Sequence, residues 1–383
     1  MGWRIDLLAT APPNDPTSGL SRVVYALGGA LAGRGHRVRV LYPADDLAET
    51  PPAGPVATVP VPLLGAGRRP FGRDIAIGRN ASALIDPDAD LLVGNDEKAG
   101  AFDPRLTRPA GRPVFAFFAH DVALHTFDTL RPLEARRGLR QRIGNALDRR
   151  ALKGLEGRAL ARARVVLVGS AANRELLERY YGVPADRVRH LPLGVPDPLD
   201  VGTKAEARLA VHVPADVPLV AFVGRTPDRQ GLPTALDAFR RIRVFFPGAR
   251  FLVVGSTVAS EPGVTGLGVV DERTKANVLR AADVFLFPAR YEGFGLAPRE
   301  AMRYGVPAIV SRHVPLEGIP APTAVRVVAG DDPGEYASEL AELLADPALR
   351  REIGEAGRRL ADELSFDRMA DRFVEIFRPV LGG

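Results

Sequence analysis

The chain has 383 residues, 46% of them hydrophobic and 25% charged, with a formal net charge of +5 and no cysteine. Its length favours two domains, and its composition excludes a disordered or fibrous architecture. The lack of cysteine excludes disulfides and thiolate nucleophiles. No stretch is apolar enough to span a membrane and the N-terminal residues are too charged for a signal peptide, so we expect a cytoplasmic protein.

Strand-like and helix-like stretches alternate from the first residues, which is typical of a parallel sheet with helices on both faces. Residues 5–9 are predicted to form a buried strand, 20–32 a helix and 36–42 the returning strand. Further strands are predicted at 91–93, 114–118, 165–168 and 188–191. Residues 1–195 are therefore predicted to form a Rossmann-like α/β domain.

The segment from Arg131 to Arg164 holds the excess positive charge. It contains eleven basic and three acidic residues, a local net charge of +8, which leaves −3 for the remainder of the chain. Apolar residues recur there at every fourth position, and we interpret them as one apolar face of a helix. These residues are Leu139, Ile143, Leu147, Ala151, Leu155 and Ala159. We favour a solvated helix over weak peripheral contact with anionic membrane lipids, and we expect no nucleic-acid partner.

Residues 196–203 are rich in Pro, Gly and Asp and are predicted to be a linker. A second alternating series starts with a strand at 219–223, so 204–364 are predicted to form a second doubly wound domain. A last helix at about 365–383 is predicted to pack back onto the first domain. Two such domains would face each other across a cleft at the carboxyl ends of their strands.

The most informative motif is YEGFGLAPREAMRYGVPAI at residues 291–309, which follows a predicted strand. Gly293 and Gly295 permit a tight turn, and Pro298 suits the first position of a helix. Amides just before Pro298 would then be free to donate to an anion, aided by the helix dipole. The sequence therefore predicts a diphosphate cradle at this turn.

Glu292 and Glu300 bracket the turn, and ionised carboxylates are suited to accept hydrogen bonds from ribose and sugar hydroxyls. Here the sequence resembles the retaining glycosyltransferases of the GT-B fold, family GT4, whose signature is two glutamates separated by seven residues. The resemblance extends over nearly the whole chain and implies that residues 1–195 bind the acceptor and residues 204–364 the nucleotide sugar. It implies that Glu292 contacts the transferred sugar, Glu300 the ribose, and the backbone of 294–297 the diphosphate.

A second matching element is FVGRTPDRQG, in which Val223 is predicted to end a strand. The resemblance implies that Arg225, after Gly224, binds the diphosphate, and a guanidinium offers a permanently charged fork for phosphate oxygens. The family usually has lysine where this chain has Gln230, and Arg229 is the candidate to replace that contact. By analogy with the family, the base is expected near Gly255 and residues 268–270.

The motif VFAFFAHD places His120 and Asp121 just after a predicted apolar strand. The resemblance implies that His120 approaches the donor sugar or the reacting bond. A metal site made of His120, Asp121 and His125 is an alternative, but no fourth ligand stands at a suitable spacing.

Further candidate residues come after two other predicted strands. With them, the predicted site has three groups of residues. The catalytic residues are His120, Arg225 and Glu292. The donor site consists of Gly19, Gly224, Arg225, Arg229, Gln230, Glu292, Gly293, Phe294, Gly295, Leu296, Ala297 and Glu300. The acceptor candidates are Ser18, Asn95, Asp96 and Asp121.

The resemblance implies a hexosyltransferase-type reaction: transfer from a nucleotide diphosphate sugar with retention at the anomeric carbon, and no metal or other cofactor. The acceptor is expected to be a small soluble molecule such as a secondary metabolite. A lipid or saccharide acceptor at the membrane surface is an alternative. A glycosidase, a phosphorylase, a nucleotide-sugar epimerase and a non-catalytic nucleotide-sugar binding protein also stay open.

Overall fold

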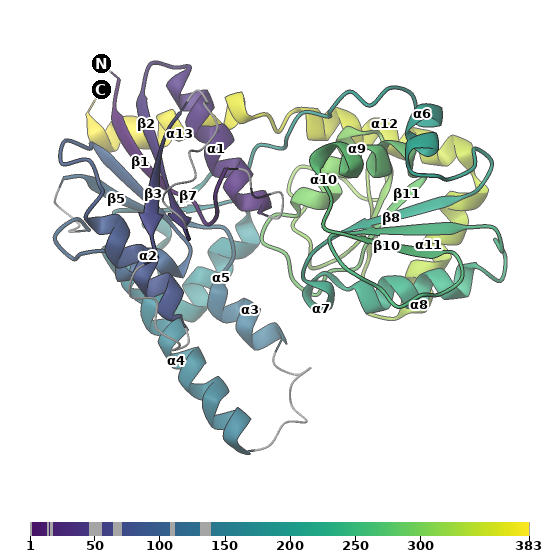
Figure 1. Cartoon of the computed structure of the whole chain (residues 1–383), viewed down its shortest axis with the longest axis horizontal. Coiled ribbons are helices and arrows are strands. Elements are labelled where there is room, and N and C mark those ends of the chain that lie inside the picture. Colours follow the sequence, from purple (N-terminus) through teal and green to yellow (C-terminus); the bar gives the residue numbers. More distant parts are fainter. Residues whose placement is uncertain are drawn as a thin grey trace. The chain divides into compact units, whose positions relative to one another are not determined.

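The computed structural model describes residues 2–13, 15, 18–45, 56–63, 71–107, 112–130 and 139–382. They form two compact units (Figure 1). Unit 1 consists of Met1–Gly194 with Phe366–Gly383, and unit 2 of Val195–Ser365. Both units are α/β, as the sequence predicts.

Unit 1 contains a seven-stranded parallel sheet in the order β3-β2-β1-β4-β5-β6-β7. Its strands are β1 (Arg4–Leu8), β2 (Arg37–Ala44), β3 (Ala57–Pro62), β4 (Leu91–Asn95), β5 (Val114–Ala119), β6 (Val165–Val168) and β7 (Val188–His190). The sequence analysis missed β3, whose two prolines in ATVPVP weaken the strand pattern. Proline is tolerated there because β3 is the edge strand.

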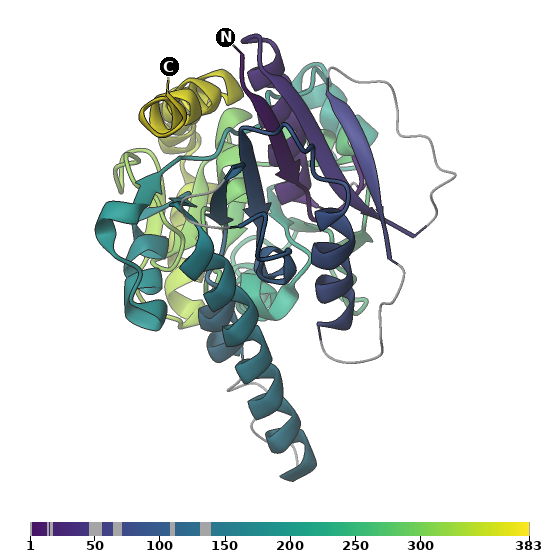
Figure 2. The same cartoon turned by 90° about the vertical axis from the view of Figure 1, so that its left-hand side faces the viewer.

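Helices cover both faces of this sheet. They are α1 (Gly19–Ala32), α2 (Gly72–Ser82), η1 (Glu97–Ala101), α3 (Ala123–Leu130), α4 (Leu139–Arg162), α5 (Ala171–Tyr181), η3 (Ala185–Arg187) and α13 (Phe366–Leu381). The C-terminal helix α13 packs beside α1, as Figure 2 shows. Arg34, just after α1, joins the two helices through ion pairs of 2.9 Å to Asp367 and 2.7 Å to Asp371.

Unit 2 contains a six-stranded parallel sheet in the order β10-β9-β8-β11-β12-β13, the strand order of dinucleotide-binding folds. Its strands are β8 (Leu219–Val223), β9 (Arg250–Val254), β10 (Val264–Gly268), β11 (Val284–Phe287), β12 (Ala308–Ser311) and β13 (Arg326–Val328). Its helices are α6 (Lys204–Ala210), α7 (Pro227–Gln230), α8 (Leu232–Ile242), α9 (Glu272–Ala281), α10 (Leu296–Arg303), α11 (Pro333–Ala345) and α12 (Pro347–Asp362). Helices α8 and α11 pack on one face, and α6, α9, α10 and α12 on the other (Figure 1).

Residues 196–203, predicted as a linker, have no regular secondary structure and are bonded to α10. Arg303 donates to the Val195 carbonyl and to Asp197, at 2.7 Å each, and the Tyr304 hydroxyl accepts from the Leu199 amide at 2.9 Å. The start of this segment is thus fixed to the end of the helix that carries Glu300.

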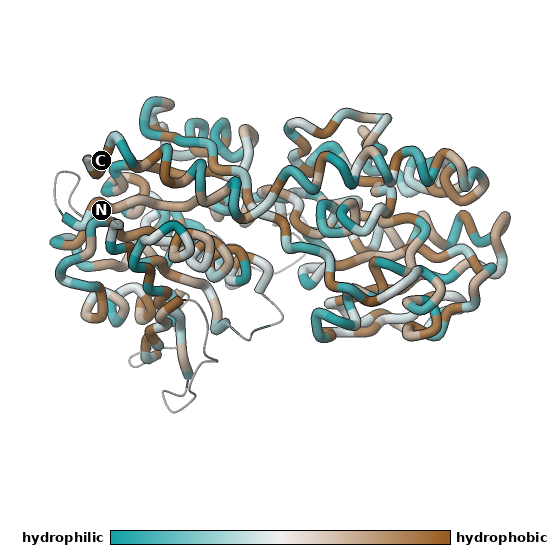
Figure 3. The backbone as a smooth tube through the Cα atoms, turned by 90° about the horizontal axis from the view of Figure 1, so that it is seen from above, coloured by the Kyte–Doolittle hydropathy of each residue, from teal (hydrophilic) through white to brown (hydrophobic). Residues whose placement is uncertain are grey.

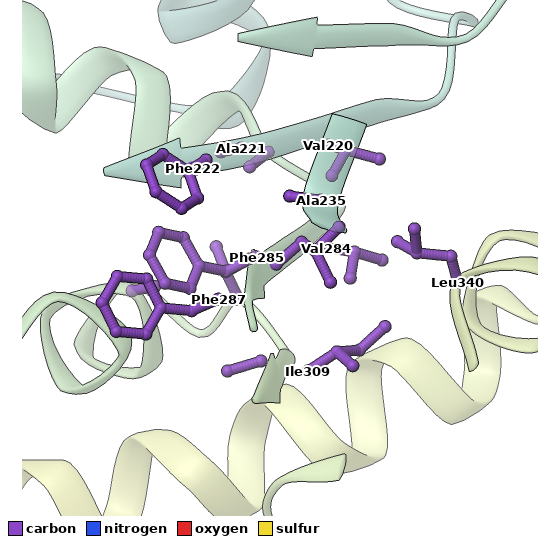
Figure 4. Close-up of a cluster of buried hydrophobic side chains, with 14 of the residues drawn as sticks. Val220, Ala221, Phe222, Ala235, Val284, Phe285, Phe287, Ile309 and Leu340 are labelled. Atoms are coloured by element: carbon purple, nitrogen blue, oxygen red, sulfur yellow. The ribbon is translucent and has the colours of Figure 1, made fainter. Parts of the chain in front are cut away.

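The core of unit 2 is formed by its central strands and the helices that pack on them. Figure 3 colours much of the helical surface in alternating teal and brown, as expected for helices that bury one side. In Figure 4 the rings of Phe222 on β8 and Phe287 on β11 lie close together, and their centroids are 5.7 Å apart. Both strands are buried, so the loops that follow them start from a rigid base.

The interpretation of one continuous apolar face on α4 is wrong. Leu155 is buried, but Leu147 is 62% exposed and Ala151 is also exposed. A spacing of four residues advances about 40° per step around a helix of 3.6 residues per turn, or about 200° from Leu139 to Ala159. The far half of α4 extends away from the sheet of unit 1 (Figures 1 and 2).

Candidate functional site

The candidate donor site lies on unit 2, at the carboxyl ends of β8 and β11. These strands are neighbours in the sheet, although most of the domain's first half lies between them in sequence. The strand order reverses at this point, and open α/β sheets bind ligands at such a switch point. The loop after β8 carries Gly224 to Gln230, and the loop after β11 carries Tyr291 to Gly295.

The loop after β8 presents Arg225 at the surface. Within the described residues, the Arg225 side chain is exposed and makes no hydrogen bond or ion pair, so its charge is available to a ligand. The Gln230 side chain instead folds back and accepts from the Thr226 amide at 2.9 Å. Gln230 therefore stabilises this loop through a neutral hydrogen bond, whereas a lysine at this position would add a positive charge.

Backbone contacts among Gly224, Gly255 and Gly268 hold the predicted base-binding segments beside the loop after β8, at the carboxyl edge of the sheet. The Gly255 amide donates to the Gly268 carbonyl at 2.7 Å, and Gly255 has φ +87°. A Cβ on Gly255 would lie 2.7 Å from the Gly224 oxygen, so this close approach requires glycine. The neighbouring Ser256 hydroxyl donates to the same Gly224 oxygen at 2.7 Å.

The turn after β11 ends in a left-handed residue. Gly295 has φ +80° and is the N-cap of α10, which begins at Leu296. The prediction that Pro298 opens the helix is therefore wrong by two residues, and Gly293 does not use a positive φ. Since proline has no N–H, the first turn of α10 offers the Leu296 and Ala297 amides as its unpaired donors.

The two motif glutamates each lie near a cation. Glu292 Oε2 is 3.6 Å from Arg229 Nη2, and both side chains are mostly buried. This pairing brings Arg229 to the site from the other loop. Glu300 is buried in α10 and forms a 2.9 Å ion pair with Lys275 of α9, which also contacts Glu272 at 2.8 Å. Lys275 thus holds the carboxylate predicted to bind ribose.

Sequence reasoning missed Arg299 as well as Lys275. Arg299 lies inside the motif but is almost completely buried beneath the turn, with its guanidinium 4.0 Å from the centre of the Phe294 ring. A charged residue at this place in a helix is normally interpreted as exposed, so no local signal identifies it. Lys275 lies in a helix about 25 residues upstream of Glu300, and only the fold brings the two together.

In unit 1, Ser18 and Gly19 lie at the start of α1. The Ser18 hydroxyl caps the helix by accepting from the Ser21 amide at 3.2 Å. It also lies 3.1 Å from the Thr10 hydroxyl, at the end of β1. Ser18 therefore has a structural role, and Gly19 is placed at the positive end of a 14-residue helix.

His120 and Asn95 form the centre of the candidate site in unit 1. The Nε2 atom of His120 lies 2.9 Å from Asn95 Oδ1, and the Asn95 amide donates to the Leu8 carbonyl. The His120 ring stacks on Phe118 with centroids 4.0 Å apart. Burial lowers the pKa of His120 to about 4, so the ring is neutral at physiological pH. Its Nδ1 atom is buried and has no hydrogen-bond partner within the described residues.

Two carboxyl groups in this part of unit 1 have raised pKa values. Asp96 has a backbone φ of +56°, and burial, together with nearby carboxylates, raises its pKa to about 7. Burial also raises the pKa of Glu156 to about 7, although Glu156 accepts from the Ala123 and Leu124 amides at 3.0 and 3.3 Å. Asp121, adjacent to His120, is partly exposed.

The metal alternative gains no support from the described residues. His125 is bonded to Tyr180, with Nδ1 3.2 Å from the hydroxyl. No group of three His, Asp or Glu side chains in the described ranges is arranged to hold a metal ion. Likewise, no helix in those ranges is both long and apolar enough to cross a membrane. The cleft expected between the units stays a prediction.

Two parallel-sheet units with polar loops at their switch points define the architecture of a GT-B glycosyltransferase. Family models agree with it: one described as Glycosyltransferase Family 4 matches residues 17–197, and one described as Glycosyl transferases group 1 matches residues 217–346. The chain belongs to the family 4 glycosyltransferases, and the family predicted from the sequence is confirmed.

Individual proteins support the same assignment. The D-inositol 3-phosphate glycosyltransferase of Segniliparus rotundus is 30% identical over 249 residues, which cover 60% of this chain and 55% of that protein. The phosphatidyl-myo-inositol mannosyltransferase of Mycobacterium leprae is 25% identical, with 96% and 94% covered. The sucrose-phosphate synthase structure from Thermosynechococcus elongatus has a TM-score of 0.78 and 23% identity, with 99% of each chain covered.

The matches differ in how much of each relative they include. The chain spans little more than half the length of the D-inositol 3-phosphate glycosyltransferases that it matches. The structural match extends over both units, but at this identity it shows the fold alone.

Proposed function

We propose that the protein transfers a sugar from a nucleotide diphosphate donor to a hydroxyl of a phosphorylated polyol or sugar, with retention at the anomeric carbon. The observation that carries this proposal is the arrangement at the switch point of unit 2. An exposed arginine, two unpaired helix amides and a glutamate–arginine pair lie on two adjacent loops there. This set offers positive charge to a diphosphate and an acceptor of hydrogen bonds to sugar hydroxyls.

Each residue has a role in the proposed donor complex. The Leu296 and Ala297 amides bind diphosphate oxygens, and Arg225 stabilises the charge that develops on the leaving diphosphate. Arg229, already beside Glu292, supplies a second guanidinium in place of the family's lysine. Because these groups supply positive charge where a divalent cation would otherwise act, we propose a reaction that needs no metal.

The proposed chemistry is a same-face displacement. The bond between the anomeric carbon and the diphosphate oxygen breaks, a bond to the acceptor oxygen forms on the same face, and the leaving diphosphate takes the acceptor proton. Glu292 binds hydroxyls of the transferred sugar and Glu300 the ribose. His120 is neutral because of its lowered pKa, so its single N–H, on Nε2, donates to Asn95 Oδ1, and its buried Nδ1 is an uncharged hydrogen-bond acceptor.

The names of the relatives support an inositol-type acceptor. Both curated names specify inositol that carries phosphate, one as D-inositol 3-phosphate and one as phosphatidyl-myo-inositol. They favour a phosphorylated cyclitol over the secondary metabolite expected from the sequence. Asn95 ends β4, and Asp96 and Asp121 lie on the loops after β4 and β5, where an acceptor hydroxyl would be bound.

A lipid acceptor is the second candidate, and one observation favours it. The far half of α4 exposes Leu147 beside exposed Arg150, in the most basic segment of the chain. An exposed apolar residue among arginines suits the interface of an anionic membrane. In that case α4 would bring the protein from the cytoplasm to its acceptor at the membrane surface.

One assay tests the proposal and separates the two acceptors. The protein is incubated with UDP-, GDP- and ADP-linked hexoses, and release of nucleoside diphosphate is measured without acceptor, with inositol phosphates and with phosphatidylinositol vesicles. We expect release that depends on acceptor, with one of the two forms preferred. Release of free sugar without acceptor, or turnover of simple glycosides, would contradict the proposal.

A further inference from the structure

Arg299 is the most deeply buried charged residue near the donor turn, at 1% exposure. It lies in the first turns of α10, and its side chain returns beneath the turn that precedes the helix. Nη1 donates to the Phe294 carbonyl and lies 3.4 Å from the Gly295 carbonyl, while Nη2 donates to the Pro315 carbonyl at 2.9 Å. The guanidinium therefore ties the turn to the loop after β12.

The charge of Arg299 is compensated incompletely. Its bonds in the described residues go to carbonyl oxygens, none of its contacts there is an ion pair within 4.0 Å, and its Nε atom has no hydrogen-bond partner. Burying a charge in this way is costly, and a methionine of similar length would avoid the cost. Burial lowers the pKa of Arg299 to about 10, which still leaves it charged at neutral pH.

The turn is tightly packed around Gly295. A Cβ on Gly295 would lie 2.7 Å from Val314 and 3.1 Å from Arg299 Nη1. The Phe294 ring covers the guanidinium at 4.0 Å, an arrangement that is favourable for a desolvated cation. With the Phe294 and Gly295 carbonyls held inward by Arg299, the amides that follow are left at the open end of α10.

We infer that Arg299 is a positioning residue for the donor diphosphate, acting from beneath the turn without touching the ligand. It fixes the carbonyls of the turn so that the Leu296 and Ala297 amides stay available, and its buried charge attracts an anion bound there. Because the charge is shielded from water, its attraction for the anion is screened less than that of a surface arginine. This inference rests on the proposed function.

Binding measurements on the full chain separate this role from simple packing. The nucleoside diphosphate is whichever of UDP, GDP and ADP raises the melting temperature most, and it is compared with its own nucleoside. Arg299→Gln keeps an amide donor and loses the charge, whereas Arg299→Lys keeps the charge and loses the planar fork. A purely structural role would weaken both ligands equally, because they share the base and the ribose.

We expect Arg299→Gln to weaken diphosphate binding about tenfold relative to nucleoside binding, and Arg299→Lys about threefold. The matched control is Arg208→Gln, since Arg208 is also buried in unit 2 and bonded to carbonyls, but lies on α6 with an ion pair of 2.7 Å to Asp283. Its ratio of the two affinities should equal that of wild type.

An unchanged ratio in the Arg299 variants would overturn the inference. If the glutamine variant does not fold, the lysine variant decides by the same criterion. If the wild-type protein binds none of the three diphosphates, the proposed function fails instead, so the two failures are distinct.

Discussion

The two units present their candidate residues in opposite electrostatic states. In unit 2 the groups at the switch point are charged: Arg225 is exposed, Arg229 faces Glu292, and Arg299 is buried with its charge. In unit 1, burial disfavours charge on two candidates: it lowers the pKa of His120 to about 4, and it raises that of Asp96 to about 7, so that Asp96 is about half ionised at neutral pH. A charged site suits a diphosphate, and a neutral hydrogen-bonding site suits hydroxyl groups.

This difference supports our proposal that the donor binds to unit 2 and the acceptor to unit 1. A polyanionic donor needs fixed cations and amides, which unit 2 supplies from loops next to each other in the sheet. An acceptor hydroxyl needs hydrogen-bond partners that do not compete for the diphosphate. His120 and Asn95 are buried and bonded to each other, so the partly exposed Asp96 and Asp121 that follow these strands are the groups placed to supply them. Variants in either unit test this difference, and they follow from the largest expected effect to the smallest.

The largest effect is expected from Glu292→Gln. The change removes the charge that pairs with Arg229 and replaces one acceptor oxygen with a donor, so transfer should fall roughly a hundredfold to a thousandfold, about 3–4 kcal/mol. The measurement is kcat with saturating donor and acceptor. Glu352→Gln, on the exposed side of α12, is the control and should leave kcat unchanged. Equal rates in both variants would contradict the proposed site.

The next largest effect is expected on the stability of unit 1, from variants in α4, which is buried at one end and exposed at the other. Leu155→Ala should lower the free energy of unfolding by about 3 kcal/mol, and Leu147→Ala by less than about 0.5 kcal/mol, because only Leu155 is in the core. Trp3, the only tryptophan in the chain, lies in unit 1, so its fluorescence during urea unfolding reports this unit. Similar losses for both variants would show that the far half of α4 is also packed.

The donor loops of unit 2 could be predicted from the sequence because their signals are local. The glycine at position 295 indicates a left-handed turn from the motif alone, and Arg225 lies two residues after the end of its strand. The interactions that complete the site are not local. Lys275 reaches Glu300 from another helix, and the direction of the Arg299 side chain depends on Pro315 in a different loop.

The sequence was less informative for unit 1, for a related physical reason. The strand positions follow from continuous apolar runs, but the protonation of His120 follows from burial that only the assembled sheet provides. The spacing of apolar residues on α4 indicated a helix correctly and its buried side incorrectly, because a period of four drifts around the helix. Burial along a long helix depends on where the sheet ends, and the pattern does not contain that information.

A pH dependence of stability is expected from Glu156. Its folded pKa is about 7 and its unfolded pKa about 4.5, so the folded state binds more protons in this window and the free energy of unfolding falls as pH rises through it. Glu156→Gln cannot titrate. The variant should therefore gain about 3 kcal/mol relative to wild type between pH 4.5 and pH 7.5.

The comparison with wild type isolates Glu156 from its neighbours. Asp96 acts in the same direction, because its pKa is also raised, and His120 in the opposite direction, because its lowered pKa makes stability rise with pH between about 4 and 6.5. Both are present in the two proteins. The contribution of His120 cancels in the difference, and that of Asp96 changes only because the Glu156 carboxylate, which helps to raise the pKa of Asp96, is lost in the variant. Urea unfolding followed by Trp3 fluorescence at each pH gives the values, and a difference independent of pH would show that Glu156 is ionised throughout.

The smallest effect is expected from Gly144→Ala, and its sign tests whether the far half of α4 is an independent helix in solvent. A Cβ on Gly144 would meet no atom within 4 Å, so alanine should stabilise unit 1 by about 0.5–1 kcal/mol through its higher helix propensity. Gly182→Ala is the matched control: its Cβ would also meet nothing, but Gly182 ends α5 with φ +62°, so alanine should destabilise. Because both sites have open space, opposite signs would assign the difference to backbone conformation alone. Destabilisation by Gly144→Ala would indicate that residues around position 144 are packed in solution.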